Sequence, residues 1–112
     1  MAYNILGDEA PEVPHYPMYV EYPEVPDFGR IAGALLYDSY TYDDGIVYVY
    51  YPNSRLNLEA YHEALRACGY TYLFSDNSEG YTQVFYQRGR VTVVFGLADL
   101  GWTMMTVHIF II

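Results

Sequence analysis

Apolar and aromatic residues recur at every second position through most of the chain from Ile31 to Ile112. A period of two is typical of β-strands, in which successive side chains point to opposite faces of a sheet. Short polar or glycine-containing segments separate these runs, and connections of this length favour antiparallel neighbours. Strands are therefore predicted at residues 32–42, 46–51, 70–74, 81–88 and 91–95, with a sixth from 102 or 103 to 112.

The last of these predicted strands is apolar on both faces. One face would carry Met105, Val107, Ile109 and Ile111, and the other Met104, Thr106, His108 and Phe110. Such a strand is typical of the centre of a sheet. The run also ends at Ile112 without a charged residue that would block association with another chain, so we expect that the protein can form a homodimer.

One segment departs from the alternation and predicts a helix over residues 58–68. Asn57 is a favourable N-cap, and Gly69 stands where helices often end in the left-handed conformation. The apolar residues of the segment fall at helical spacing and form one stripe: Leu58, Tyr61, Ala64, Leu65 and Cys68. The element order β-β-α-β-β-β-β predicts an α+β domain over residues 28–112, a two-layer sandwich with one helix on a mainly antiparallel sheet.

The segment before this domain has a period of three. Residues 8–27 hold five of the six prolines, at spacings that are all multiples of three. Because a polyproline II helix has three residues per turn, residues 1–27 are expected to be an extended arm, with Tyr16, Tyr19 and Tyr22 along one edge. This arm would pack along the domain as an ordered strap, or join it to a preceding domain. It could instead bind an aromatic-grooved partner, but such ligands usually need a flanking basic residue, which the arm lacks.

Tyrosines are concentrated in the first predicted hairpin. We expect Asp43-Asp44-Gly45 to form a type I turn with Gly45 in the left-handed position, which pairs Tyr42 with Ile46 and Tyr40 with Tyr48. Four tyrosines would then share one face: Tyr40, Tyr42, Tyr48 and Tyr50. Tyrosine offers contact area and a hydroxyl group at low entropic cost, so these residues and the three arm tyrosines are the candidate binding residues.

Charge and composition exclude several classes of function. Fourteen acidic residues against five arginines give a net charge of −9, which repels phosphate backbones and anionic membranes. No apolar stretch approaches the roughly 20 residues that span a bilayer. The single cysteine, Cys68, cannot form an internal disulfide or a cysteine cluster for zinc. We therefore expect neither nucleic acid nor a membrane span.

Several short sequences together resemble a known type of domain. Pro26-Asp27-Phe28-Gly29 precedes the hairpin, Leu58-Glu59-Ala60-Tyr61 opens the helix, and Cys68-Gly69-Tyr70 ends it. This pattern resembles small domains of unknown function in lipoproteins and secreted proteins of Gram-positive bacteria. The resemblance implies a non-enzymatic, extracytoplasmic domain. The first residues of the chain lack the basic and apolar regions of a signal peptide.

Candidate catalytic and metal-binding residues are few. Asp38, Asp43 and Asp44 form the densest acidic cluster, but Asp-Asp-Gly is ordinary turn chemistry. His15, His62 and His108 have no short ligand spacing; we expect His62 to face solvent on the helix and His108 to lie on the sheet beside Thr106. Cys68 lies at the C-terminal end of the helix, where the dipole disfavours a thiolate. We expect no catalytic residue, no metal and no cofactor.

Three functions remain as hypotheses, in decreasing order of preference. The first is a non-catalytic interaction or accessory domain of a bacterial surface or envelope protein, which binds a protein or a neighbouring domain through the tyrosine-rich hairpin or the arm. The second is a carbohydrate-binding module that uses the same tyrosines. The third is a small hydrolase that uses Asp38 or Asp44 together with His108.

Overall fold

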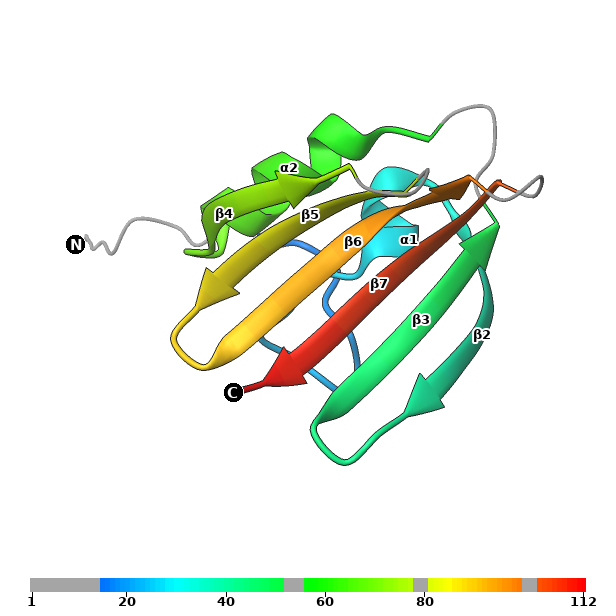
Figure 1. Ribbon diagram of the computed structural model, residues 1–112. Helices are drawn as coiled ribbons and strands as arrows, with labels where there is room; N and C mark the ends of the chain where they lie inside the picture. The colour runs from blue at the N-terminus through cyan, green and yellow to red at the C-terminus, as the bar shows by residue number, and fades with distance from the viewer. Residues whose placement is uncertain (1–14, 52–55, 78–80, 100–102) are drawn as a thin grey trace.

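The protein folds as an α+β domain built on one antiparallel sheet (Figure 1). The structure is a computed structural model and describes residues 15–51, 56–77, 81–99 and 103–112. The sheet has six strands in the order β2-β3-β7-β6-β5-β4, and every neighbouring pair is antiparallel. These strands are β2 (Leu35–Thr41), β3 (Gly45–Tyr51), β4 (Thr71–Asp76), β5 (Tyr81–Arg88), β6 (Val91–Asp99) and β7 (Thr103–Ile111).

The last strand of the chain is central, as its two apolar faces predict. β7 pairs with β3 on one side and β6 on the other. Met105, Val107 and Ile109 are fully buried, while the alternate residues are half-buried on the other face. Both edges of β7 are therefore covered within one copy of the chain, so the uncharged end at Ile112 no longer argues for association through this strand.

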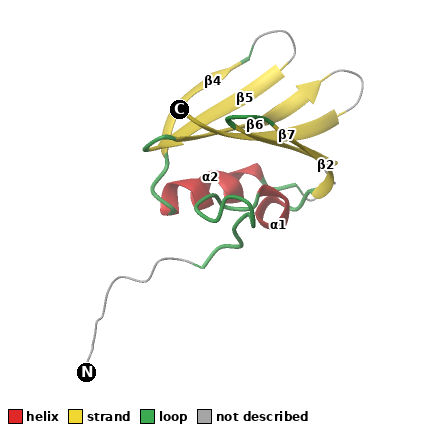
Figure 2. Ribbon diagram, turned by 90° about the horizontal axis from the view of Figure 1, so that it is seen from below, coloured by secondary structure: helices red, strands yellow, loops and turns green. Residues whose placement is uncertain are grey.

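Two helices, α1 (Phe28–Ala32) and α2 (Leu58–Ala67), lie on the same face of the sheet (Figure 2). The sequence predicts α2 within one residue: Asn57 accepts a hydrogen bond from the Ala60 amide at 3.1 Å, and Gly69 has a φ of 89°. Only α2 was expected; α1 lies before the predicted first strand and overlaps it only at Ala32. Asp27 caps α1 and Gly33 ends it with a φ of 86°, so β2 begins only at Leu35.

The core between the helices and the sheet is largely aromatic. Phe28 of α1 meets the ring of Tyr61 of α2 edge-on, with ring centroids 4.9 Å apart, and Tyr61 meets Phe95 of β6 in the same way at 5.1 Å. All three side chains are almost completely buried. At roughly 1.5–3 kcal/mol for each large side chain, this burial provides much of the free energy that holds the helices to the sheet.

The described part of the arm is not an extended ribbon. Residues 17–27, called the strap below, double back: the Tyr19 amide donates to the Val25 carbonyl at 3.0 Å and the Asp27 amide to the Pro17 carbonyl at 2.8 Å. Tyr19 and Val25 belong to the core cluster. Burial explains the difference from a polyproline II helix, whose backbone amides need water, because buried amides need partners within the protein. Pro11 and Pro14 lie outside the described residues.

The hairpin between β2 and β3 has a different register from the predicted one. The Tyr42 amide donates to the Gly45 carbonyl at 2.7 Å, so Asp43 and Asp44 alone form the loop. Thr41 therefore pairs with Ile46 and Tyr40 with Val47. Gly45 does not have a left-handed φ; a Cβ there would instead collide with the Ile109 carbonyl oxygen of β7. A register shift of one residue changes which side chains of the two strands lie on the same face of the sheet.

Candidate binding surface

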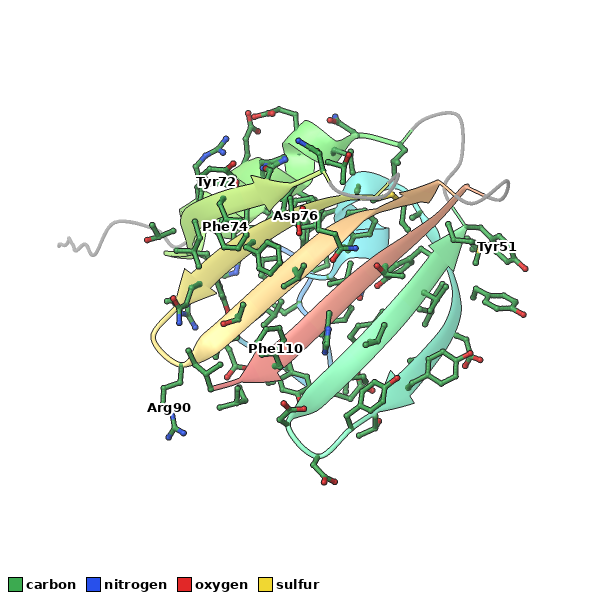
Figure 3. All side chains as sticks on the ribbon, in the orientation of Figure 1. Tyr51, Tyr72, Phe74, Asp76, Arg90 and Phe110 are labelled. Carbon is green, nitrogen blue, oxygen red and sulfur yellow. The ribbon has the colours of Figure 1, made fainter. Side chains whose placement is uncertain are left out.

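The sheet has one face that none of the described helices or loops covers, called the open face below (Figures 1 and 3). Pairing across all six strands aligns its side chains in rows. The middle row is Tyr40, Val47, His108, Val94, Phe85 and Phe74, in the order of the strands from β2 to β4. The row on one side is Asp38, Val49, Thr106, Gly96, Gln83 and Asp76, and the row on the other side includes Phe110, Thr92, Gln87 and Thr71.

Formal charge in these rows is confined to the edges of the sheet. Asp38 lies on β2 and Asp76 on β4, whereas the four inner strands contribute only apolar or uncharged polar side chains and His108. In a chain with a net charge of −9, this arrangement leaves a neutral centre with an acidic rim. Protein interfaces have the same anatomy, with few charges at the centre and polar groups around it.

Aromatic rings on the open face contact one another both across neighbouring strands and along β7. Phe74 of β4 stacks on Phe85 of β5, with centroids 4.3 Å apart and an angle of 16° between the rings. Tyr51 meets Tyr37 edge-on at 4.9 Å. Phe110 lies 4.9 Å from the imidazole of His108. Figure 3 shows Tyr51, Phe74 and Phe110 at well-separated positions of this face.

The structure separates the hairpin tyrosines that were expected to share one face. Tyr42 is 55% exposed and its ring lies 6.4 Å from that of His108, so Tyr40 and Tyr42 belong to the open face. Tyr48 and Tyr50 are only 4% and 2% exposed and face the helix side. The expectation of one solvent-facing tyrosine ladder is therefore wrong, because the hairpin register differs by one residue.

Among the candidate tyrosines of the arm, Tyr19 is buried and Tyr16 and Tyr22 are half-buried. Tyr19 stacks on Tyr48, with centroids 4.2 Å apart and 10° between the rings. Its hydroxyl group shares a 2.6 Å hydrogen bond with that of Tyr50 and accepts one from the Phe28 amide. This packing corresponds to the ordered-strap alternative, and it leaves the ring of Tyr19 inaccessible to a partner.

Burial also changes the ionisation of these tyrosines. Desolvation raises the pKa of Tyr19, Tyr48 and Tyr50 well above the ordinary value. The Tyr48 hydroxyl donates to Glu21 at 2.6 Å, which raises the pKa of Tyr48 further because the bond favours the protonated phenol. These phenols therefore stay protonated and act as structural hydrogen-bonding groups.

His62 differs from its expected place on the wet side of the helix. Its Nδ1 lies 2.6 Å from the Tyr86 hydroxyl, and its ring packs edge-on against Phe95 at 5.1 Å. Arg66 donates to the same hydroxyl at 3.3 Å and to Glu59 at 3.1 Å. Partial burial lowers the pKa of His62 below its usual range. His62 therefore helps to seat α2 on the sheet.

Of the residues considered for catalysis, Asp44 is close enough to His108 for its charge to raise the pKa of the imidazole, although burial of His108 has the larger and opposite effect. Asp38 accepts a hydrogen bond from the Ser39 amide at 2.8 Å, while the His108 ring lies 6.4 Å from that of Tyr42 and 4.9 Å from that of Phe110. Burial lowers the pKa of His108 and raises that of the Cys68 thiol. Within the described residues, no three histidine, cysteine or acidic side chains converge to hold a metal ion.

Sequence reasoning did not single out the phenylalanines of the open face. Phe74, Phe85 and Phe110 come from three strands, and their proximity depends on pairings between distant segments. A bulge between Tyr72 and Phe74 also moves Phe74 onto the open face while Tyr72 stays opposite the buried Tyr86. The available signals were the alternation within β5, which separates Phe85 from Tyr86, and the alternation within β7, which places Phe110 on the face of His108.

Comparisons with protein-family models, with curated proteins and with solved structures found no match to this chain. Neither helix of the described residues combines the length and apolarity needed to cross a membrane.

Proposed function

We propose that this chain is a non-catalytic interaction domain, a two-layer sandwich that buries the open face of its sheet against a protein partner. The observation that carries the proposal is the neutral centre of that face, where the inner four strands present no formally charged side chain in the three rows. The apolar side chains of this face are exposed at Tyr40, Tyr51 and Phe74 and half-buried at Val47, Phe85 and Phe110, and contiguous apolar surface of this kind marks interaction sites in soluble proteins. A bacterial surface or envelope protein is the proposed setting, as the sequence resemblance implies.

A second copy of the chain is the partner that the open face fits best. Six strands spaced about 4.8 Å apart, with about seven residues each at 3.3 Å, give a face of roughly 600 Å² in projection. This area approaches the roughly 800 Å² that each partner buries in a standard interface. Two sheets can pack face to face at about 10 Å and interdigitate their apolar side chains.

A carbohydrate-binding module is the second candidate, because aromatic rings lie exposed on the same face. The ring contacts favour a protein partner over a sugar. Phe74 and Phe85 stack on each other and Tyr51 meets Tyr37 edge-on. A neighbouring ring therefore already covers part of each ring surface on which a sugar would stack. Glycan binding that persists at high salt and is lost in Tyr40→Ala or Tyr51→Ala would favour the sugar-binding alternative.

Sedimentation velocity over a range of protein concentrations tests the proposal. The wild-type chain is expected to dimerise. Thr106→Glu places a charge at the centre of the open face and should raise the dissociation constant of the dimer by about 100-fold, because the charge would be buried without a partner. Val20→Glu makes the same change in charge on the strap, at a residue that is 89% exposed, and should leave the constant within about twofold.

Two results would contradict self-association through the open face. One is a wild-type chain that remains monomeric up to about 1 mM, the concentration at which even a weak contact of about 4 kcal/mol is half-populated. The other is a dimer that Thr106→Glu and Val20→Glu weaken equally. Circular dichroism spectra of both variants would show that each is folded.

A further inference from the structure

A pocket lies on the helix side of the sheet, away from the open face. It has a volume of about 420 Å³, which falls within the range of roughly 300–1,000 Å³ typical of small-molecule sites. The strap, the start of α1 and strands β2 and β3 all contribute to its walls. The lining residues on which the inference depends are Glu21, Asp27, Leu35, Leu36, Ser39, Tyr48 and Tyr50.

The aromatic wall of this pocket is held in place by contacts beneath it. Tyr48 is stacked on Tyr19 at 4.2 Å, and the hydroxyl groups of Tyr19 and Tyr50 are 2.6 Å apart. All three side chains are buried, so their rotamers are fixed by packing. These buried rings form a rigid base for the pocket, while its accessible apolar surface comes from Leu35 and Leu36. Because folding has already ordered the base, a ligand pays less conformational entropy on binding.

The polar groups of the pocket are mainly acidic. Glu21 accepts the Tyr48 hydroxyl at one carboxylate oxygen, Oε1, at 2.6 Å. Asp27 accepts the Arg30 amide at 3.2 Å through Oδ1. Two carboxylates against the single guanidinium of Arg30 give the lining a formal charge of −1, in a chain of charge −9. This field attracts cations and repels anions.

We propose that the pocket binds a small organic cation, an ammonium group attached to a compact apolar or aromatic body. The ammonium group would lie near the Glu21 and Asp27 carboxylates, and the apolar body would rest against Leu35 and Leu36, which are 69% and 53% exposed. Glu21 lies near the middle of the strap and Asp27 at its end, and the strap is held closed by the hydrogen bonds from the Tyr19 amide to the Val25 carbonyl and from the Asp27 amide to the Pro17 carbonyl. This site is independent of the open face and of the proposed interaction role.

The test is an NMR titration of the whole chain with three ligands of the same shape. Benzylammonium carries the proposed charge, benzyl alcohol is neutral and phenylacetate is an anion. Benzylammonium should shift the backbone amides of Gly29 and Ser39 in a saturable way, with an affinity at least about tenfold higher than that of benzyl alcohol, a difference of about 1.4 kcal/mol. Phenylacetate should cause no saturable shift at these amides.

Matched variants distinguish binding of the cation in this pocket from its non-specific attraction to an acidic protein. Glu21→Gln removes the charge but keeps an oxygen that can accept the Tyr48 hydroxyl, and Asp27→Asn likewise keeps a cap for α1. Each should weaken benzylammonium binding at least about fivefold, as expected for the loss of a close charge pair. Glu63→Gln changes the net charge equally on the exposed side of α2 and should have no effect.

Three outcomes would overturn the proposal: equal affinity for benzylammonium and benzyl alcohol, an equal effect of Glu63→Gln and Glu21→Gln, or saturable shifts that map to the open face instead of the pocket. Spectra of the free variants report whether each is folded, and two independent pocket variants keep the result decisive if one of them is unstable. Because no dimer is required, this test is separate from that of the interaction role.

Discussion

Tyrosine hydroxyl groups determine, at the residue scale, how the strap is fixed to the domain. The buried Tyr61 hydroxyl of α2 donates to the Pro26 carbonyl at 2.7 Å, and the Tyr70 hydroxyl donates to the Glu24 carbonyl at 3.0 Å. Desolvation raises the pKa of Tyr70 to about 12. These bonds satisfy strap carbonyls that would otherwise be shielded from water without a partner. The phenol ring fills the core while its oxygen fixes the backbone of a distant segment.

Removing one of these hydroxyl groups should destabilise the protein measurably. Tyr61→Phe keeps the ring but leaves the Pro26 carbonyl without its donor, so the free energy of unfolding should fall by about 1–2 kcal/mol in urea. Tyr42→Phe serves as the control, since its side chain is mostly exposed, and should change stability by less than about 0.5 kcal/mol. Equal effects of the two substitutions would contradict this role of Tyr61.

The half-buried histidines make stability depend on pH. Burial lowers the folded-state pKa of His62 and His108 below 6.5, so the unfolded chain takes up protons first as the pH falls. The unfolded state then binds more protons, and stability is lost as the pH drops below about 6.5. Between pH 7 and pH 5, the wild-type chain should therefore lose stability relative to a His62→Gln/His108→Gln double variant in urea unfolding. Parallel pH profiles of the two proteins would contradict this interpretation.

The sequence does not distinguish the buried tyrosines from the exposed ones. Tyr40 and Tyr50 stand in similar alternating runs, yet one lies on the open face and the other in the core. Tyrosine suits both places, because its ring is apolar and its hydroxyl group can bind either water or a buried carbonyl. Whether a tyrosine is buried depends on long-range partners, such as Tyr19 for Tyr50. The local sequence carries no information about these partners.

At the element scale, long periodic segments were predicted well and short ones were not. α2 and both faces of β7 follow from ten and nine residues of regular pattern, respectively. α1 has five residues, too few to establish a helical period, and only Asp27 and Gly33 at its two ends indicate it. The register of the β2–β3 hairpin was predicted wrongly because Gly45 was assigned to the turn, whereas a contact outside the hairpin requires glycine at this position. Gly45 is needed for the close approach of β7, which no local turn rule reveals.

Substitution of this glycine tests the observed register. Gly45→Ala would place a Cβ against the Ile109 carbonyl oxygen and 2.8 Å from the Cα of Phe110, so β3 and β7 would have to separate. The expected loss of stability is at least about 3 kcal/mol, in the range of severe backbone clashes. Gly89→Ala, with a φ of 60° and open space around its Cβ, should cost only about 1–2 kcal/mol. The reverse order in thermal or urea unfolding would favour the turn that the sequence predicts.

At the scale of the whole molecule, charge and apolar surface are separated. The net charge of −9 opposes any contact between two copies at long range, whereas the open face concentrates its acidic groups at the two edge strands. Overall charge could be predicted from composition. The neutral face could not, because it arises from the order of six strands that the sequence did not specify.

Salt should therefore strengthen self-association. Raising NaCl from about 0.01 M to about 1 M shortens the Debye length from about 30 Å to about 3 Å and screens the repulsion between the two acidic copies. The apolar contact itself is not weakened by this screening. The dimer dissociation constant measured by sedimentation should fall with added salt. An increase would indicate an interface built on ion pairs.

The most direct test of the open face is an isotope-filtered NOE experiment on a mixture of labelled and unlabelled copies. We predict contacts between the copies from the partly exposed side chains at the centre of this face, above all Val47, Phe85 and Phe110. Intermolecular NOEs confined to α2, the strap or the edges of β2 and β4, or no such NOEs from a chain that remains monomeric, would contradict the central claim.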